Sequence, residues 1–139
     1  EQSVSRIANI QADFAEQNGI RWAIIARADG QFLGTCGFWR LIKEHFRAEI
    51  GYELAPAWWG RGIMTEAVRA ALDFGFDVMG LHSVEAQIAP ENTGSRRVLE
   101  KVGFTQEAYF RENYFDPIEA RFTDTAVFSL LRSAWSSQR

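Results

Sequence analysis

Apolar residues along the chain fall into two patterns, short runs bounded by turn residues and longer stretches with helical spacing. The short runs, several of them rich in β-branched and aromatic residues, predict six strands, over residues 20–28, 31–42, 46–55, 81–89, 104–114 and 119–131. Asp29-Gly30 between the first two runs is typical of a β-hairpin turn. In the last run Phe122, Ala126, Phe128 and Leu130 share one side, together with Asp124.

Helical spacing predicts three helices, over residues 3–18, 61–79 and about 92–102. The second is apolar over most of its surface, which predicts burial against a sheet. Asn92 is a favoured N-cap for the third helix, and Gly103 closes it. The order of these elements predicts a mixed α/β fold, with a central sheet of about six strands flanked by helices. At 139 residues, we expect a single domain over 1–139.

Residues 49–67 predict a strand that runs through a tight loop into a helix. Gly60 and Gly62 permit a sharp turn and a close approach of a ligand to the backbone. The start of the helix offers unpaired N–H groups and a partial positive charge, to which Arg61 adds a full cation, so the segment suits a phosphate. The alternative is an ordinary turn that uses two glycines for steric reasons. Neither the nucleotide-triphosphatase loop nor the dinucleotide fingerprint is present.

A second constellation lies around the third predicted helix. Asn92 and Ser95 have the spacing Asn-x-x-Ser, and Gly103 and Phe104 follow eight and nine residues after the serine. The alternative is a capped helix with an exposed basic turn. Taken as a set, this spacing is much less common than any one of its residues.

Together these two segments resemble the GNAT N-acetyltransferase superfamily, over about residues 21–132. The hexapeptide Ala57-Trp58-Trp59-Gly60-Arg61-Gly62 is similar to the family's acyl-CoA loop, Gln/Arg-x-x-Gly-x-Gly/Ala, with Ala57 in place of Gln or Arg. The longer form Trp-Gly-Arg-Gly-x-x-Thr-Glu-Ala and the block beginning at Asn92 resemble the RimJ/RimL-like branch. Compared with that family, the chain is expected to lack the first strand and helix.

The resemblance implies transfer of an acetyl group from acetyl-CoA to a primary amine, either a protein N-terminus or a small amine. The pantetheine arm would pair with the end of strand 46–55 near Leu54. The cofactor-binding residues that it implies are Leu54, Trp59, Gly60, Arg61, Gly62, Ile63, Met64, Thr65, Asn92, Ser95 and Arg96.

For catalysis, the resemblance implies a base that accepts the proton of the amine and an acid that protonates the CoA thiolate. Glu49 occupies the position of the family's strand carboxylate, with Glu53 or a water chain as the alternative base. Glu49 is also consistent with an exposed strand residue in a cross-strand ion pair. Many relatives carry a tyrosine as the acid where this chain has Leu99. In the RimJ/RimL-like branch a serine four positions earlier is proposed for that role, and Ser95 stands there.

Composition narrows the remaining classes of function. With 15 basic and 18 acidic residues the net charge is −3, which argues against wholesale binding of nucleic acid or of an anionic membrane. Cys36 is the one cysteine, and His45 and His82 are far apart, so no metal site is expected. Without an apolar run of membrane-spanning length or a visible signal peptide, we expect a cytoplasmic protein. The aromatic candidates for an acceptor pocket are Trp39, Trp58, Tyr109 and Tyr114.

Two further expectations concern the edge of the sheet and the alternative function. If the first strand and helix of the family are missing, residues 20–28 form an unprotected sheet edge that invites a homodimer. The alternative function is a non-catalytic acyl-CoA-binding module that kept the loop and lost the chemistry.

Overall fold

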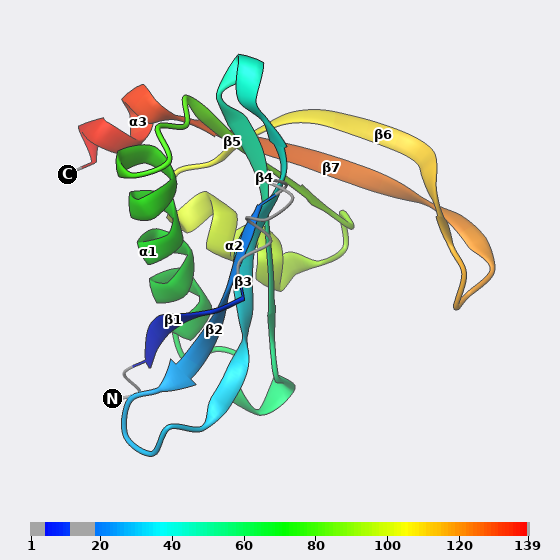
Figure 1. The fold of residues 1–139 in the computed structure, drawn as a ribbon. Helices are drawn as coiled ribbons and strands as arrows, with labels where there is room; N and C mark the ends of the chain where they lie inside the picture. The colour runs from blue at the N-terminus through cyan, green and yellow to red at the C-terminus, as the bar shows by residue number, and fades with distance from the viewer. Residues whose placement is uncertain (1–4, 12–18, 139) are drawn as a thin grey trace.

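The computed structural model describes residues 5–11 and 19–138, and it shows one sheet with three helices (Figure 1). Seven strands form the sheet in the order β1-β2-β3-β4-β5-β7-β6. The strands are β1 Ser5–Gln11, β2 Ile20–Ala26, β3 Phe32–Ile42, β4 Arg47–Leu54, β5 Ser83–Ile88, β6 Thr105–Asp116 and β7 Arg121–Leu131. The helices are α1 Ile63–Asp77, α2 Thr93–Lys101 and α3 Arg132–Ser137. The mixed α/β fold and the elements from β2 to β7 are therefore confirmed.

Within the sheet, β4 and β5 form the parallel pair, and every other ladder between described strands is antiparallel. A parallel pair needs a crossover, which α1 supplies. The β4–β5 ladder is short, running from Arg47↔Ser83 to Glu49↔Glu85. By contrast, β4 stays paired with β3 as far as Leu54, and β5 stays paired with β7 as far as Ile88. The two central strands therefore diverge beyond Glu49 and open the sheet.

The hydrophobic core lies between the sheet and the helices. Its largest fully buried side chains include Phe128 of β7 and Ile24 of β2, with Leu72 and Phe76 of α1. Gly75 lets α1 approach β3 closely, because a Cβ built there would stand 2.8 Å from the ring of Phe38.

The C-terminal helix α3 closes one end of this core and was not predicted from the sequence. Its Trp135 is buried, and the indole Nε1 donates to Asp73 Oδ1 over 3.1 Å. Arg132 Nη1 donates to the carbonyl oxygens of Phe76 and Leu81, which lie at and beyond the end of α1. These contacts attach α3 to α1.

The helix predicted over residues 3–18 is wrong where the structure describes it. Residues 5–11 form β1, paired antiparallel with β2 from Ser5↔Ala26 to Gln11↔Arg21, and residues 12–18 lie outside the described residues. The pairing satisfies the edge N–H and C=O groups of β2, a nonlocal contribution that outweighs local helical spacing. The edge expected to be open at 20–28 is thus covered, which removes the argument for a homodimer through it.

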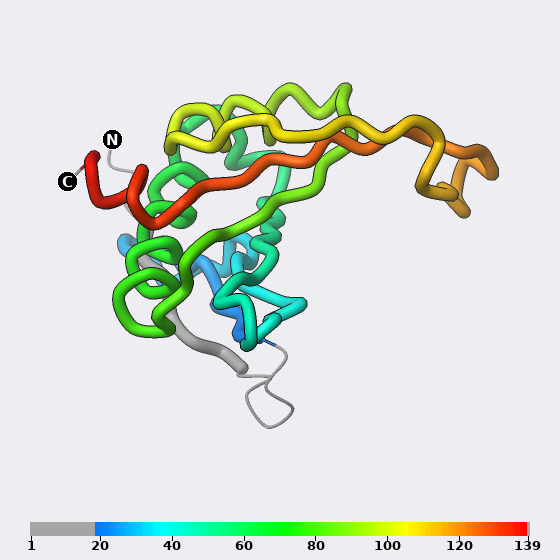
Figure 2. Tube along the Cα trace, turned by 90° about the horizontal axis from the view of Figure 1, so that it is seen from above, coloured from blue at the N-terminus to red at the C-terminus, as the bar shows by residue number. Residues whose placement is uncertain are grey.

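The β6–β7 hairpin extends beyond the helices as an arm (Figure 1) and is seen from above in Figure 2. This extension explains why Phe122, predicted on the core side of β7, is 59% exposed while Phe128 is buried. Asp124, the one polar residue on that side, has a role in the arm. Its carboxylate accepts hydrogen bonds from the Tyr109 hydroxyl and from the Glu112 N–H, at the irregularity in the β6–β7 register.

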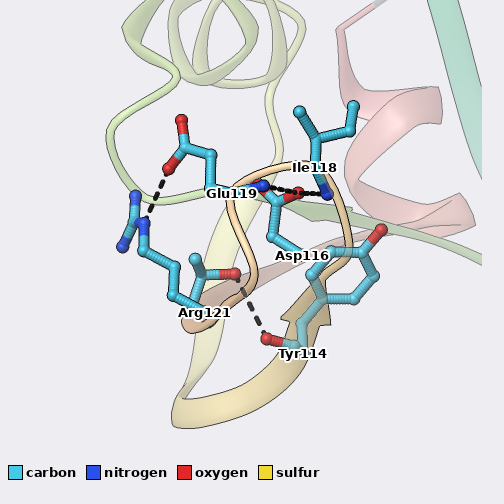
Figure 3. Close-up of polar contacts among 6 residues, drawn as sticks. Tyr114, Asp116, Ile118, Glu119 and Arg121 are labelled. Carbon is cyan, nitrogen blue, oxygen red and sulfur yellow. Dashed lines mark hydrogen bonds and ion pairs between the residues drawn. The ribbon is translucent and has the colours of Figure 1, made fainter.

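The tip of the arm is held by its own polar contacts (Figure 3). Asp116 Oδ1 accepts from the N–H groups of Ile118 and Glu119, over 2.9 and 3.3 Å. Arg121 pairs with Glu119 over 2.6 Å.

Among residues 5–11 and 19–138, no helix combines the length and the apolar character that crossing a bilayer requires.

Candidate functional site

The divergence of β4 and β5 opens a cleft of about 1120 Å³ on the side of α1 and α2. The ends of β3 and β4, the loop that follows β4, the start of α1 and one face of α2 line it. Of the residues predicted to bind a cofactor, those that line the cleft are Leu54, Trp59, Gly60, Gly62, Ile63, Met64, Thr65, Asn92 and Ser95.

The loop between β4 and α1 turns at two glycines. Gly60 and Gly62 have φ angles of +77° and +78°, a left-handed conformation that L side chains rarely adopt. A Cβ built on either glycine would meet no atom within 4 Å, so the space in front of the loop is open. The glycines are thus needed for the shape of the loop and not for packing against the protein.

Main-chain N–H groups of the loop are mostly without acceptors. From Gly60 to Thr65, none donates to an acceptor among residues 5–11 and 19–138, and Glu66 is the first to donate, to Gly62 O over 3.1 Å. The Trp59 N–H differs from our expectation, because it donates to Pro56 O over 3.1 Å. No side chain caps the start of α1. This row of N–H groups is therefore without acceptors among the described residues, and it stands at the positive end of a 15-residue helix.

Aromatic side chains brace the loop. Trp59 Nε1 donates to Leu54 O over 2.7 Å, which ties the loop to the end of β4. The Arg61 guanidinium lies over the ring of Trp58, 4.7 Å from its centroid, so the predicted cation is present beside the loop but does not line the cleft.

On α2, the cation that lines the cleft is not the predicted one. Arg96 is turned toward the sheet, where its Nη1 donates to Gln106 Oε1 over 3.0 Å and its guanidinium lies over the Phe128 ring. Arg97 and Lys101 line the cleft instead. They stand four residues apart and so share one face of α2, a spacing that can be read from the sequence.

The helix cap predicted at Asn92 is confirmed, because its Oδ1 accepts from the Ser95 N–H over 3.0 Å. The Ser95 hydroxyl lies 3.3 Å from the hydroxyl of Tyr52 on β4, to which it donates. Tyr52, like Arg97 and Lys101, is a residue of the cleft that the sequence did not predict. Burial raises the pKa of Tyr52 to about 12, and the contact with Ser95 only partly offsets this. Leu99, the position at which the family resemblance implies a tyrosine in many relatives, is fully buried in the core.

Glu49 is the last β4 residue paired with β5, and it is only 8% exposed. Its Oε1 lies 3.3 Å from Arg40 Nη1, in an ion pair without the geometry of a hydrogen bond. Arg40 has a φ of +51° where the β3–β4 register shifts. Burial raises the pKa of Glu49 against the opposing effects of Trp39 and Arg40. The ion pair considered as an alternative is present, but the carboxylate is not exposed.

A second hollow, of about 190 Å³, lies beside Gly37, Trp39, Gly51 and Glu53. The two glycines leave this part of the sheet without side chains, and the Trp39 ring covers Gly51 so closely that a Cβ there would stand 2.3 Å from it. Glu53 lines both this hollow and the cleft.

The four aromatic candidates for an acceptor pocket are not brought together. Trp39 lines the hollow and Trp58 lines the cleft, while Tyr109 and Tyr114 belong to the arm and line neither. In the part of the chain that the structure describes, no group of three or more His, Cys, Asp or Glu side chains could hold a metal ion.

Comparison with known proteins identifies the family. Residues 1–105 match the model of the acetyltransferase (GNAT) domain. The chain belongs to the GNAT acetyltransferase family. It is 36% identical to the uncharacterized N-acetyltransferase YoaA of Bacillus subtilis, over 95% of this chain and 73% of YoaA. The Escherichia coli enzyme named for acetylating an alanine of ribosomal protein uS5 is 26% identical, over 78% of this chain and 56% of its own length.

Solved structures of GNAT enzymes share the fold. The N152L mutant of the spermidine N-acetyltransferase SpeG from Vibrio cholerae aligns with a TM-score of 0.82 at 23% identity, covering 90% of this chain and 71% of SpeG. At that identity the likeness establishes the fold and leaves the substrate open. The chain spans 56 to 73% of the lengths of these three relatives.

The raised pKa of Glu49 in this GNAT domain predicts a pH dependence of stability. A carboxyl whose pKa rises on folding stabilises the fold below its unfolded pKa, and that contribution is lost as the pH rises through the folded pKa. Relative to Glu49→Gln, the wild type should lose free energy of unfolding as the pH rises above 4.5, the ordinary value for Glu49. Urea denaturation of both proteins between pH 4 and 7 measures this difference. Glu53→Gln, which alters an exposed carboxylate, is the control, and a wild type that gains stability over Glu49→Gln with rising pH would contradict the assignment.

Proposed function

We propose that this GNAT domain, as a single acyltransferase domain over 1–139, transfers an acetyl group from acetyl-CoA to a primary amine by direct attack on the thioester. The observation that carries the proposal is the row of main-chain N–H groups from Gly60 to Thr65, which have no acceptor among the described residues. Apart from Arg61, the residues of this row line a cleft of about 1120 Å³. Such a row at a helix start suits a diphosphate. Arg61, Arg97 and Lys101 would add positive charge around it.

The open edge of β4 supports a place for the pantetheine arm. Beyond Glu49, β4 has no β5 partner, so its main-chain groups from Ile50 to Leu54 on that side are available to an extended ligand, except the Leu54 carbonyl oxygen, which accepts from Trp59 Nε1. A thioester placed in the divergence would have β4 main-chain N–H groups near its carbonyl oxygen. In other enzymes, removing one preorganised donor to the oxyanion raises the activation free energy by roughly 3–4 kcal/mol.

The proposed base is Glu49, with Glu53 or a water chain as the alternative. Burial keeps the Glu49 pKa above its ordinary value, which brings it nearer to the pKa that suits a base at neutral pH. Ser95 is proposed to return a proton to the CoA thiolate. A covalent route through Cys36 is not favoured, because burial raises the pKa of that thiol to about 12 and keeps it protonated.

For the acceptor we propose a protein N-terminus or a small amine, as in the RimJ/RimL-like branch. The names of two relatives support this pair of classes, since one acetylates spermidine and the other an alanine of a ribosomal protein. The carboxylates of Glu49 and Glu53 would favour a cationic acceptor. The second candidate is a non-catalytic acyl-CoA-binding module. Leu99 favours it, because a leucine cannot give the CoA thiolate the proton that a tyrosine at this position would supply.

Gly62→Ala tests the cofactor loop, with Gly30→Ala as a matched control. Both glycines have φ near +75° and both would place the new Cβ in open space, so each change should cost the fold a similar ~1–2 kcal/mol. Only Gly62 lies in the cleft. Gly62→Ala should therefore weaken acetyl-CoA binding by about ten-fold, or ~1.4 kcal/mol, in isothermal titration calorimetry. Equal affinities for the two variants would count against the loop.

Free-thiol release from acetyl-CoA tests the reaction, using a panel of N-terminal peptides, polyamines and aminoglycosides. We expect at least one amine to stimulate release, and Glu49→Gln to shift the activity toward higher pH, because the amine must then lose its proton without the carboxylate. Unchanged rates across the pH range would remove Glu49 from the mechanism. Binding of acetyl-CoA without release for any amine would instead support the binding module.

A further inference from the structure

Tyr52 lines the cleft and has no role assigned so far. It stands on β4 three residues beyond the last β4–β5 pair, next to Cys36 on β3, and it lines the cleft together with Ser95. Tyr52 also borders the hollow beside Trp39, which its β4 neighbours Gly51 and Glu53 line. Tyr52 therefore brings a phenol into the space where β4 and β5 separate.

The phenol is coupled to Ser95 by two contacts across 43 residues of sequence. The Ser95 hydroxyl donates to Tyr52 Oη over 3.3 Å, and Tyr52 Oη donates to the Ser95 carbonyl oxygen over 3.5 Å. The backbone of Ser95 is fixed independently by the Asn92 cap. What remains free in Ser95 is the rotation that places its hydroxyl, and Tyr52 is the described group that holds it.

The acid strength of the two hydroxyls gives this coupling a direction. Burial raises the pKa of Tyr52 to about 12, so the phenol stays protonated at neutral pH and cannot serve as a base. A phenol is nevertheless a stronger acid than an aliphatic alcohol. A serine that gives up its proton next to a neutral phenol can therefore take the proton of the phenol in return.

We infer that Tyr52 is a positioning residue for Ser95, which orients the serine hydroxyl in the cleft and replaces its proton when the thiolate leaves. The inference rests on the proposed acetyl transfer. It also gives a physical reason why this chain can carry Leu99 where relatives carry a tyrosine, because a phenol reaches the cleft from β4 instead of from α2.

The protons of the proposed acetyl transfer balance. The amine nitrogen forms a bond to the acetyl carbon, and the C–S bond breaks with its electron pair on sulfur. The Ser95 hydroxyl rotates away from Tyr52 Oη and gives its proton to sulfur. Tyr52 then turns its O–H from the Ser95 carbonyl oxygen to Ser95 Oγ, 3.3 Å away, and gives it a proton. The proton lost by the amine returns to Tyr52 through solvent, so acetyl-CoA and amine become amide and free thiol without another reactant.

The test compares Tyr52→Phe, Ser95→Ala and the double variant by steady-state free-thiol release with an amine that the wild type accepts. Tyr52→Phe keeps the ring and its packing, so thermal unfolding should stay near that of the wild type. We expect the kcat of Tyr52→Phe to fall by roughly ten- to a hundred-fold, with the KM for acetyl-CoA changed by less than about two-fold. Ser129→Ala, whose hydroxyl bonds Glu107 outside the cleft, is the control and should keep wild-type kcat.

Non-additivity decides whether Tyr52 acts through Ser95. If it does, the double variant should be no slower than Ser95→Ala alone, whereas independent roles would multiply the two losses. Wild-type kcat in Tyr52→Phe or in Ser95→Ala, or multiplied losses in the double variant, would overturn the inference while leaving acetyl transfer in place. A wild type that binds acetyl-CoA but acetylates no amine would overturn the proposed function, and this inference with it.

Discussion

The short ladder between β4 and β5 is the constraint on which the rest of the site depends. Three residue pairs hold the two strands together, and beyond Glu49↔Glu85 each strand continues with a different neighbour. The sheet must then open, because β4 follows β3 and β5 follows β7. The opening leaves the N–H and C=O groups along one side of β4 without a strand partner, and it places the start of α1 and the inner face of α2 on either side of the gap. A fully paired sheet would have no cleft there.

Hydroxyl groups and carboxylates lie on different sides of this opening. On the side of the helices, Ser95 and Tyr52 meet as neutral hydroxyls near the uncapped start of α1. Glu49 and Glu53 share one face of β4 with Gly51, and Glu53 lines the second hollow, while Tyr52 points its phenol toward α2. A strand places successive side chains on opposite faces, so Tyr52 and the carboxylate proposed as the base leave β4 on opposite sides. Acetyl transfer as proposed needs that separation, because the amine loses its proton on one side of the thioester and the sulfur gains one on the other.

The parts of the fold that the sequence predicts are those with a local cause. Strands β2 to β7 and helices α1 and α2 follow from periodicity, and the Asn92 cap follows from the preference for asparagine just before a helix. A helix was predicted where β1 lies, because the apolar residues there have helical spacing. The pairing of β1 with β2, which that spacing does not reveal, decides its conformation. Arg96 was predicted to bind the cofactor and lies over Phe128 instead, because the rotation of α2 about its axis depends on the burial of Leu99 in the core. The contact between Tyr52 and Ser95 joins residues 43 apart and leaves no local pattern to detect.

The central claim is that main-chain N–H groups from Gly60 to Thr65 bind the diphosphate of CoA. The most direct test records the amide chemical shifts of a ¹⁵N-labelled protein during titration with CoA and with pantetheine, which carries no phosphate. The account predicts that CoA shifts the Gly60–Thr65 amide signals in a saturable way, that pantetheine leaves them in place, and that the Gly30 amide responds to neither. Loop amides that stay unchanged while CoA binds elsewhere would contradict it.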